Sequence, residues 1–318
     1  MAASLFSPTF SPTSSASIPK ASVAESAHEL KHSWWSISSA TQRTCPILAL
    51  AREHNLIVIE DASQAPGAIY QGRKVGGLGD MTVFSLNYHK HIHTGEGGIV
   101  TTDNEDYAEH LRLIRNHGES VVGGKGVDDI VNAFGLNLRM SELAAALSVT
   151  QLAKLPPLLD RRIANVEYLS SRIAQLPGIT PPVVRPGCKH VYYDQILLFD
   201  STVVGTTRER FVDAVSAELP TSEDRDWPLI CARYVDPLYL LPMFQKQIAI
   251  GASGWPFSAA AAKPDYKRGL CPVTERLQEH HLIFTEFMRP PCTIDDMRDV
   301  ADAFEKVYEH RADLAITG

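Results

Sequence analysis

Three side chains with complementary chemistry follow the ends of two predicted strands. Asp61 ends the apolar run LIVIED, Ser85 lies near the end of MTVFSL, and Lys90 follows five residues later. Ligands of open α/β sheets bind at the carboxyl ends of the strands, so we expect these three groups at adjacent strand ends. They suit pyridoxal phosphate, which needs an amine to condense with its aldehyde, a carboxylate for its pyridine nitrogen and donors for its phosphate.

Each of these residues has a plainer explanation when it is taken alone. A lysine after a strand is usually a solvated loop residue, and an aspartate at a strand end usually caps a turn or a helix. Three histidines at alternate positions, with Glu96 nearby, could also suggest a metal site, because alternate residues of an extended chain point the same way. These histidines are His89, His91 and His93. Lys90 lies among them and would repel a cation, so we expect no metal here.

The segment that carries these residues is predicted to form one α/β layer from about residue 45 to 118. Apolar spacing in PILALAREHN predicts a helix, and LIVIED, MTVFSL and GGIVTT predict three strands. Asp103 and Asp106 suggest a capping box for a helix that continues through YAEHLRLIRNH. Helix and strand therefore alternate, as in α/β proteins.

The second half of the chain predicts a smaller α+β domain. Two helices are expected in SELAAALSVTQLAKL and RRIANVEYLSSRIAQL, separated by a break at Pro156 and Pro157. VYYDQILLF predicts a strand, and TTRERFVDAVSAEL and TIDDMRDVADAFEKVYEH predict capped amphipathic helices. The stretch from Trp227 to Arg289 gives no clear element. We expect a leader at 1–44, a large domain at 45–150, and linking helices with a small domain at 151–318.

The composition is that of a globular protein without a strong affinity for polyanions. With 318 residues, 44% of them hydrophobic, the chain can bury one large core or two ordinary ones. A formal charge of -7 argues against nucleic acid or anionic membranes as partners and favours a small molecule. The five cysteines are far apart without a CxxC pair, which predicts neither a zinc site nor a disulfide framework.

Residues 1–44 differ in character from the rest of the chain. They are rich in Ser, Ala, Thr and Pro, with no acidic residue before Glu25, and bury too little apolar surface to offset the entropy of ordering. We expect a disordered or unrelated leader, or alternatively an organelle transit peptide, although Lys20 is its only early basic residue. No apolar run approaches the roughly 20 residues that span a bilayer. The expected location is the cytoplasm, or an organelle if the leader is a targeting signal.

Four motifs give the chain a strong resemblance to one known family. They occur in the expected order from about Cys45 onward: EDASQAPGA, GDMTVFSLNYHKHIHTGEGG, LRLIRNHG and GLNLRMSELAAAL. The chain resembles the DegT/DnrJ/EryC1/StrS aminotransferases, which use pyridoxal phosphate and mostly aminate nucleotide-linked keto sugars. The resemblance implies fold type I, with a truncated large domain on a mainly parallel sheet and a smaller C-terminal α+β domain. It also implies an aminotransferase whose amino donor is glutamate.

The same resemblance implies roles for five residues. Lys90 would hold the cofactor through its amine and then act as the acid and base of a proton shift. Asp61 would pair with the pyridine nitrogen, Gln64 would contact the 3-hydroxyl side of the ring, and Ser85 would bind the phosphate. Asn137 resembles an asparagine that reaches the phosphate from the neighbouring subunit, which implies a homodimer with shared active sites. The plainer alternative is that Asn137 caps the helix that follows it.

One part of the family pattern is not recognisable in this sequence. Members carry a long segment before the one that matches PILALAREHN, and it supplies the first strands of the sheet, a phosphate-binding turn at a helix N-terminus and an aromatic ring that stacks on the cofactor. Trp34 and Trp35 do not match that ring in context, and we expect them to be exposed or loosely packed. An alternative is therefore a catalytically impaired homologue that acts as a binding or dimerisation protein. A family dehydratase is disfavoured because those members replace the lysine, and Lys90 is present.

Overall fold

The computed structural model describes residues 32–36, 44–118, 134–220, 228–260 and 265–314. These residues form two compact units. The N-terminal unit holds the described residues up to 163 together with 184–193, and the C-terminal unit holds 164–183 and the described residues from 194 onward. No helix in the described residues is long and apolar enough to cross a membrane.

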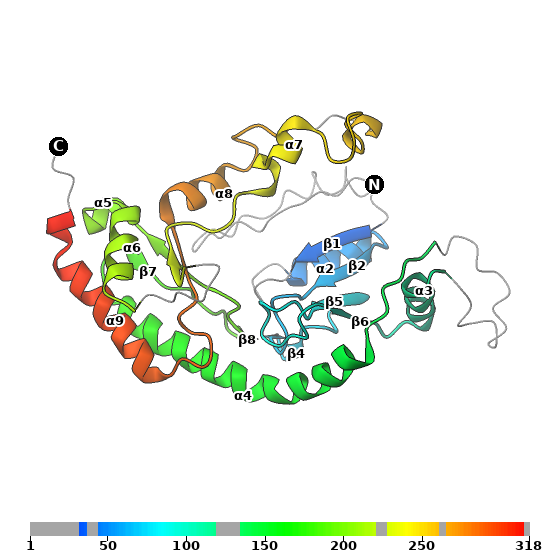
Figure 1. Ribbon diagram of the computed structural model, residues 1–318, viewed down its shortest axis with the longest axis horizontal. Helices are drawn as coiled ribbons and strands as arrows, with labels where there is room; N and C mark the ends of the chain where they lie inside the picture. Colours follow the sequence, from blue (N-terminus) through cyan, green and yellow to red (C-terminus); the bar gives the residue numbers. More distant parts are fainter. Residues whose placement is uncertain (1–31, 37–43, 119–133, 221–227, 261–264, 315–318) are drawn as a thin grey trace. The chain divides into compact units, whose positions relative to one another are not determined.

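The main sheet of the N-terminal unit has four strands in the order β1-β2-β5-β6 (Figure 1). These strands are β1 (His32–Ser36), β2 (Ile57–Asp61), β5 (Met81–Ser85) and β6 (Gly98–Thr101). β1, β2 and β5 run parallel, and β6 is antiparallel to β5. The helix α2 (Thr44–Glu53) precedes β2, and α3 (Glu105–Arg115) follows β6. The expected α/β layer with a mainly parallel sheet is confirmed.

A second, smaller sheet in this unit joins two distant parts of the chain. It is antiparallel and consists of β4 (Arg73–Lys74), β3 (Ile69–Tyr70) and β8 (Cys188–Lys189). Through β8, the segment 184–193 becomes part of the N-terminal unit although it lies far along the chain. Val191 of the segment 184–193 packs in a core with buried alanines that follow β2 and buried leucines of a long helix described next: Ala62, Ala65, Ala68, Leu155 and Leu159.

The helix break expected at Pro156 and Pro157 is wrong. Both prolines lie inside one continuous helix, α4 (Glu142–Ile173). An interior proline removes a helical hydrogen bond and usually costs about 3 kcal/mol. Here Leu155 and Leu159, next to the prolines, are buried in the core. Their burial, worth about 1.5–3 kcal/mol for each side chain, offsets part of that cost. Tertiary packing thus overrides the local signal.

The C-terminal unit is built on an antiparallel sheet in the order β10-β11-β9-β7. Its elements, after the last turns of α4, are β7 (Ile179–Thr180), β9 (Gln195–Phe199), α5 (Ser201–Val204), α6 (Arg208–Ala217), β10 (Ile230–Cys231), η2 (Leu238–Leu240), α7 (Pro242–Lys246), η3 (Phe257–Ala259), α8 (Pro272–Arg276), the π-helix η4 (Leu277–His281), β11 (Leu282–Thr285), α9 (Ile294–Glu309) and η5 (Arg311–Leu314). Phe211 of α6 and Phe304 of α9 are fully buried in its core. The two predicted amphipathic helices are confirmed, and α9 begins with a capping box between Thr293 and Asp296.

Three local expectations differ from the structure. Residues 32–36 fall within the expected leader but form β1, consistent with the strand propensity of the adjacent tryptophans; the Trp34 and Trp35 side chains and the rest of 1–43 lie outside the described residues. The cap of α3 is Asn104, whose side chain accepts from the Tyr107 amide at 3.1 Å, and not Asp103. The region 227–289, which gave no clear element, contains β11, an inner strand of the sheet in the C-terminal unit.

Candidate active site

Asp61 and Ser85 lie on the same face of the main sheet at the ends of neighbouring parallel strands. Asp61 ends β2 and lies beside Val83 of β5, and Ser85 is two residues further along β5. Because side chains alternate between the two faces of a strand, Asp61, Val83 and Ser85 share one face. The Ala62 amide continues the pairing by donating to the Val83 carbonyl at 2.8 Å. The adjacency predicted for the carboxylate and the hydroxyl is therefore confirmed.

Both side chains are partly buried and hydrogen-bonded to the turn that follows them. Asp61 Oδ1 accepts from the Ser63 amide at 3.0 Å. Ser85 Oγ accepts from the Asn87 amide at 3.2 Å. Asp61 Oδ2 and the Ser85 hydroxyl proton make no hydrogen bond to the described residues, so one acceptor and one donor remain for a ligand. One hydrogen bond from a backbone amide thus orients each side chain and leaves part of its hydrogen-bonding capacity available.

Lys90 lies in a loop that is closed by backbone hydrogen bonds at its base. Leu86 donates to the Gly97 carbonyl at 2.9 Å and accepts from the Thr94 amide at 3.0 Å. The Lys90 amide donates to the Asn87 carbonyl at 2.9 Å, which places the lysine at a tight turn. The loop therefore begins one residue after Ser85, and its closed base ties the position of Lys90 to the end of β5.

The other side of this loop contacts the segment 184–193. The imidazole Nε2 of buried His91 lies 3.0 Å from the Val191 carbonyl oxygen. The Lys90 ammonium lies 4.6 Å from the centre of the Tyr193 ring. Buried Arg162 of α4 donates from one guanidinium nitrogen to the carbonyls of Tyr192 and Tyr193, at 2.9 and 3.1 Å. Arg162 of α4 thus holds this segment in place, and the Tyr193 ring faces the lysine. We call residues 190–193 the aromatic wall.

His190 begins this wall and is held in its neutral form. Burial lowers the pKa of its imidazole from 6.5 to about 4, because the charged ring would lose solvation. Its Nδ1 accepts from the Tyr192 amide at 2.9 Å, which requires an unprotonated nitrogen. The ring also contacts that of Tyr192, with centroids 4.2 Å apart. His190 therefore helps to hold the wall in place while it stays neutral.

The remaining predicted residues lie in less constrained surroundings. Gln64 is partly buried, three residues after Asp61. Asn137 is exposed and forms an isolated bridge with Asn116, and its Oδ1 accepts from the Arg139 amide at 3.4 Å. Asn137 does not cap the following helix, because Ser141 Oγ takes that place by accepting from the Ala144 amide at 3.2 Å. The helix-capping role expected in the plainer alternative is therefore wrong, although Asn137 is a loop residue.

The three histidines near Lys90 have different surroundings. His91 is buried, while His89 and His93 are exposed, and the ring of His89 lies against that of Tyr88 with centroids 3.8 Å apart. The described residues contain no group of three or more His, Cys, Asp or Glu side chains placed to hold a metal ion. This arrangement gives no geometric support to a metal interpretation.

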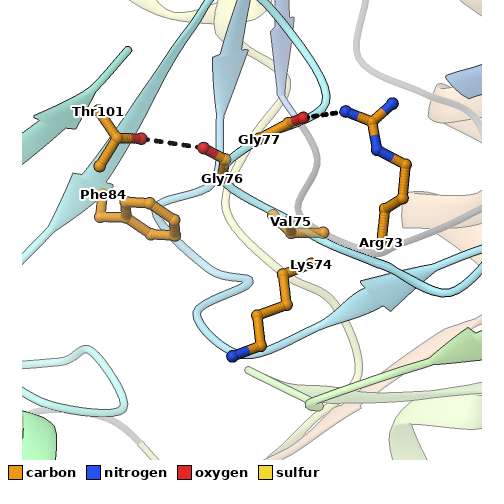
Figure 2. Close-up of a pocket in the computed structure, with 7 residues that line it drawn as sticks. All are labelled: Arg73, Lys74, Val75, Gly76, Gly77, Phe84 and Thr101. Atoms are coloured by element: carbon orange, nitrogen blue, oxygen red, sulfur yellow. Dashed lines mark hydrogen bonds between the residues drawn. The ribbon is translucent and has the colours of Figure 1, made fainter. Parts of the chain in front are cut away.

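A hollow of about 530 Å³ lies on the opposite face of the same sheet (Figure 2). Its lining is Arg73, Lys74, Val75, Gly76, Gly77, Phe84 and Thr101. Phe84 precedes Ser85 in β5 and therefore points to the other face. Thr82 and buried Glu60 share that face, where the Thr82 hydroxyl and the Gly76 amide donate to Glu60 Oε2 at 2.8 and 3.3 Å. The hollow is thus separated by the sheet from Asp61 and Ser85.

Comparison with known proteins identifies the family. The model of the DegT/DnrJ/EryC1/StrS aminotransferase family matches residues 45–282, which is most of the chain. This chain belongs to that family. The family resemblance predicted from the four motifs is thereby confirmed, and the residues that carry them include all five candidate site residues.

Individual relatives and solved structures of the family agree. The chain is 31% identical over 276 residues to L-glutamine:2-deoxy-scyllo-inosose aminotransferase from Streptoalloteichus tenebrarius, covering 84% of this chain and 62% of the relative. It is 36% identical over 177 residues to GDP-perosamine synthase from Caulobacter vibrioides, covering 54% of this chain and 45% of the relative. An aminotransferase structure from Psychrobacter cryohalolentis matches with a TM-score of 0.69 and 26% identity, covering 88% of this chain and 69% of that one. The chain spans 62% of the length of several curated relatives that it matches.

The residues present fit the cofactor that the family implies. A carboxylate and a hydroxyl lie at adjoining strand ends, and a lysine lies in the loop that follows one of them; these groups match a pyridine nitrogen, a phosphate and an aldehyde. Two parts of the arrangement were not predicted from the sequence: the Asn87 side chain, which donates to Glu96 Oε1 at 2.7 Å across the loop, and the wall formed by Tyr193. The sequence predicts one strand over VYYDQILLF, but only Gln195–Phe199 forms β9. The preceding residues, which include Tyr193, belong to the wall instead.

Proposed function

We propose that this protein is a pyridoxal-phosphate-dependent aminotransferase that transfers an amino group from glutamate to the ketone of a nucleotide-linked sugar. The observation that supports this most is the placement of Asp61, Ser85 and Lys90 around the ends of β2 and β5. Two relatives whose names contain a nucleotide-linked sugar, GDP-perosamine synthase and UDP-4-amino-4,6-dideoxy-N-acetyl-beta-L-altrosamine transaminase, support the substrate class.

Pyridoxal phosphate, when bound, supplies an electron sink that stabilises a carbanion next to the transferred nitrogen. Asp61 Oδ2 would hold a proton on the pyridine nitrogen, and the Ser85 hydroxyl would donate to a phosphate oxygen. Gln64 would contact the 3-hydroxyl side of the ring. The Lys90 amine would attach the cofactor and then carry a proton between two carbons, as a general base and then as a general acid.

The attachment of cofactor to Lys90 is directly testable. The purified chain is incubated with pyridoxal phosphate, reduced with borohydride and digested, and the modified peptide is identified by mass spectrometry. We expect a stable adduct on Lys90 that is lost in Lys90→Ala and retained in Lys74→Ala, which removes an exposed lysine of the same unit. Absence of an adduct on Lys90 at saturating cofactor would refute the proposal.

The substrate class needs a separate measurement of nitrogen transfer. Protein loaded with cofactor is given ¹⁵N-glutamate or ¹⁵N-glutamine together with a nucleotide-linked keto sugar or a cyclitol ketone, and the products are analysed by mass spectrometry. We expect label from glutamate in the nucleotide-linked amino sugar. Label only in the cyclitol, or only from glutamine, would replace the proposed substrate or donor while leaving the reaction type intact.

We also propose that the chain works as a homodimer in which Asn137 serves the partner's site. The segment 134–138 and the first turns of α4 expose many large apolar side chains: Phe134, Leu136, Leu138, Leu143, Leu147, Val149 and Leu152. A helix with apolar residues on several sides is normally covered. Since Asn137 lies among these residues, the same contact would bury the surface and deliver the asparagine.

The molar mass measured by light scattering during size-exclusion chromatography tests this oligomeric state. We expect a dimer for the natural chain and a folded monomer for Leu143→Glu, because Leu143 is 86% exposed and a charge there opposes burial. Val203→Glu, at an exposed position of the C-terminal unit, is the matched control and should remain dimeric. A natural chain that is monomeric at all concentrations would exclude the dimer.

The exposed apolar surface also favours a second candidate function, that of a catalytically impaired binding or dimerisation protein. This candidate predicts that Lys90→Ala leaves the cellular role intact while Leu143→Glu abolishes it. The aminotransferase proposal predicts that both changes abolish the role. Complementation of a strain that lacks the gene, with each variant in turn, separates the two functions.

A further inference from the structure

The side chain of Lys90 is directed onto the ring of Tyr193. Its ammonium nitrogen lies 4.6 Å from the ring centroid, within the roughly 6 Å at which a cation is attracted to an aromatic face. Tyr193 is only 9% exposed. The attraction is stronger when water is excluded from the ring, so a buried tyrosine is a more effective partner than an exposed one.

The ring is itself fixed in position by contacts that belong to the same unit. The backbone carbonyl of Tyr193 accepts a hydrogen bond from Arg162 at 3.1 Å, and Arg162 is buried in α4. Two residues earlier, the Val191 carbonyl lies 3.0 Å from His91 Nε2, one residue after Lys90. Two contacts therefore hold the Lys90 loop against the segment 190–193. One is between Lys90 and the Tyr193 ring, and the other is between the His91 imidazole and the Val191 carbonyl.

We propose that Tyr193 is a positioning residue that holds the Lys90 amine beside the site whenever the amine is not engaged. The proposal rests on the proposed function, in which Lys90 must release its bond and return to the same place in each cycle. A lysine side chain has four rotatable bonds, and ordering it costs up to about 2 kcal/mol in rotamer entropy. A ring that restricts the ammonium to one region keeps the free amine in place between cycles, and this contact is released when the amine engages.

The first test measures the reactivity of Lys90 in the full chain without added cofactor. The protein is acetylated at low reagent concentration, and the rate at Lys90 is measured by mass spectrometry relative to exposed Lys74. We expect Tyr193→Leu to raise the relative rate about fivefold, because the ammonium form loses its contact with this ring. Tyr193→Phe keeps a ring and should stay within about twofold of the natural chain. Tyr88→Leu, which removes an exposed ring two residues from Lys90, should change nothing.

A second measurement leaves Tyr193 unchanged and uses a variant only to assign the signal. Lysines are reductively methylated with ¹³C, and the Lys90 methyl signal is assigned by its loss in Lys90→Arg. We expect a ring-current shift to high field relative to Lys74, because the amine lies over the ring face. An unshifted Lys90 signal, or equal acetylation rates in Tyr193→Leu and the natural chain, would overturn the proposal.

Borohydride trapping then separates this inference from the function on which it rests. We expect Tyr193→Leu to raise the trapped fraction at limiting cofactor about fivefold, because the ring stabilises only the unattached ammonium, and Tyr193→Phe to stay close to the natural chain. Altered acetylation and a shifted methyl signal without trapping in any variant would reject the cofactor chemistry but keep the contact. Trapping that is equal in all variants would reject the positioning role but keep the cofactor.

Discussion

Acidification should weaken the folded state through His190, and the effect can be estimated from its pKa. Burial lowers the pKa of this imidazole from 6.5 to about 4, so the unfolded chain binds a proton at a pH where the folded chain does not. Stability is therefore complete above pH 6.5 and falls as the pH approaches 4. The full difference is about 3 kcal/mol, at 1.36 kcal/mol for each pKa unit. At pH 5 the loss is about 2 kcal/mol, an upper value because the ring keeps some exposure.

The variant His190→Asn isolates this contribution. An asparagine side-chain oxygen can accept from the Tyr192 amide, as His190 Nδ1 does at 2.9 Å, but does not titrate in this range. We expect the stability difference between pH 8 and pH 5, measured by urea unfolding, to be about 2 kcal/mol smaller in this variant than in the natural chain. His110→Asn, which removes an exposed imidazole from α3, should keep the natural difference.

Two outcomes would refute the reasoning about His190. The first is an NMR titration in which its ring protonates near pH 6.5, which would mean that burial does not disfavour the charge. The second is an equal loss of stability in His190→Asn and the natural chain between pH 8 and pH 5. Because the chain has two units, the unfolding is followed with a probe in the N-terminal unit, such as protection of the Tyr192 amide from hydrogen exchange.

Three further changes test the packing. Phe304→Ala should destabilise the C-terminal unit by about 3–5 kcal/mol in urea unfolding, because the side chain is fully buried and leaves a cavity. Thr293→Ala should cost about 1 kcal/mol through loss of the capping box of α9, as measured by thermal unfolding. Gly76→Ala should cost about 1–3 kcal/mol, since φ is +109° and the new methyl would lie 2.7 Å from the Phe84 ring. Gly72→Ala, with φ +77° and open space, should cost less in the same assay.

The strand ends that carry Asp61 and Ser85 were predictable because their signal is local. Each strand is a short apolar run, and parallel strands present their carboxyl ends at one edge of a sheet. β2 and β5 are consecutive strands of the main sheet, and consecutive strands are usually neighbours. Lys90 then follows because it lies only five residues after Ser85. In this part of the site, the information lies within about 30 residues of sequence.

The aromatic wall was not predictable in the same way. Tyr193 lies about 100 residues after Lys90, and the run VYYDQILLF resembles one continuous strand. The contact exists because β8 pairs with β3 and because Arg162 binds two successive carbonyls of the wall. Neither interaction has a periodic signature. The same reason explains the continuous α4, where buried leucines from a distant packing contact outweigh a local helix-breaking signal.

The exposed apolar surface and the location of Asn137 lead to one last prediction that joins assembly to cofactor binding. Asn137 is in the exposed segment that pairs with residues 114–117 and carries Phe134, Leu136 and Leu138. If a second copy covers this surface, binding of the cofactor and binding of the copy favour each other by the same free energy. Cofactor affinity should then fall on dilution, and saturating cofactor should shift the monomer–dimer equilibrium toward dimer. Sedimentation with and without cofactor measures this shift, and Asn137→Ala should abolish the shift without preventing dimerisation. A cofactor affinity that is independent of protein concentration through the dissociation range would show that each copy completes its site alone.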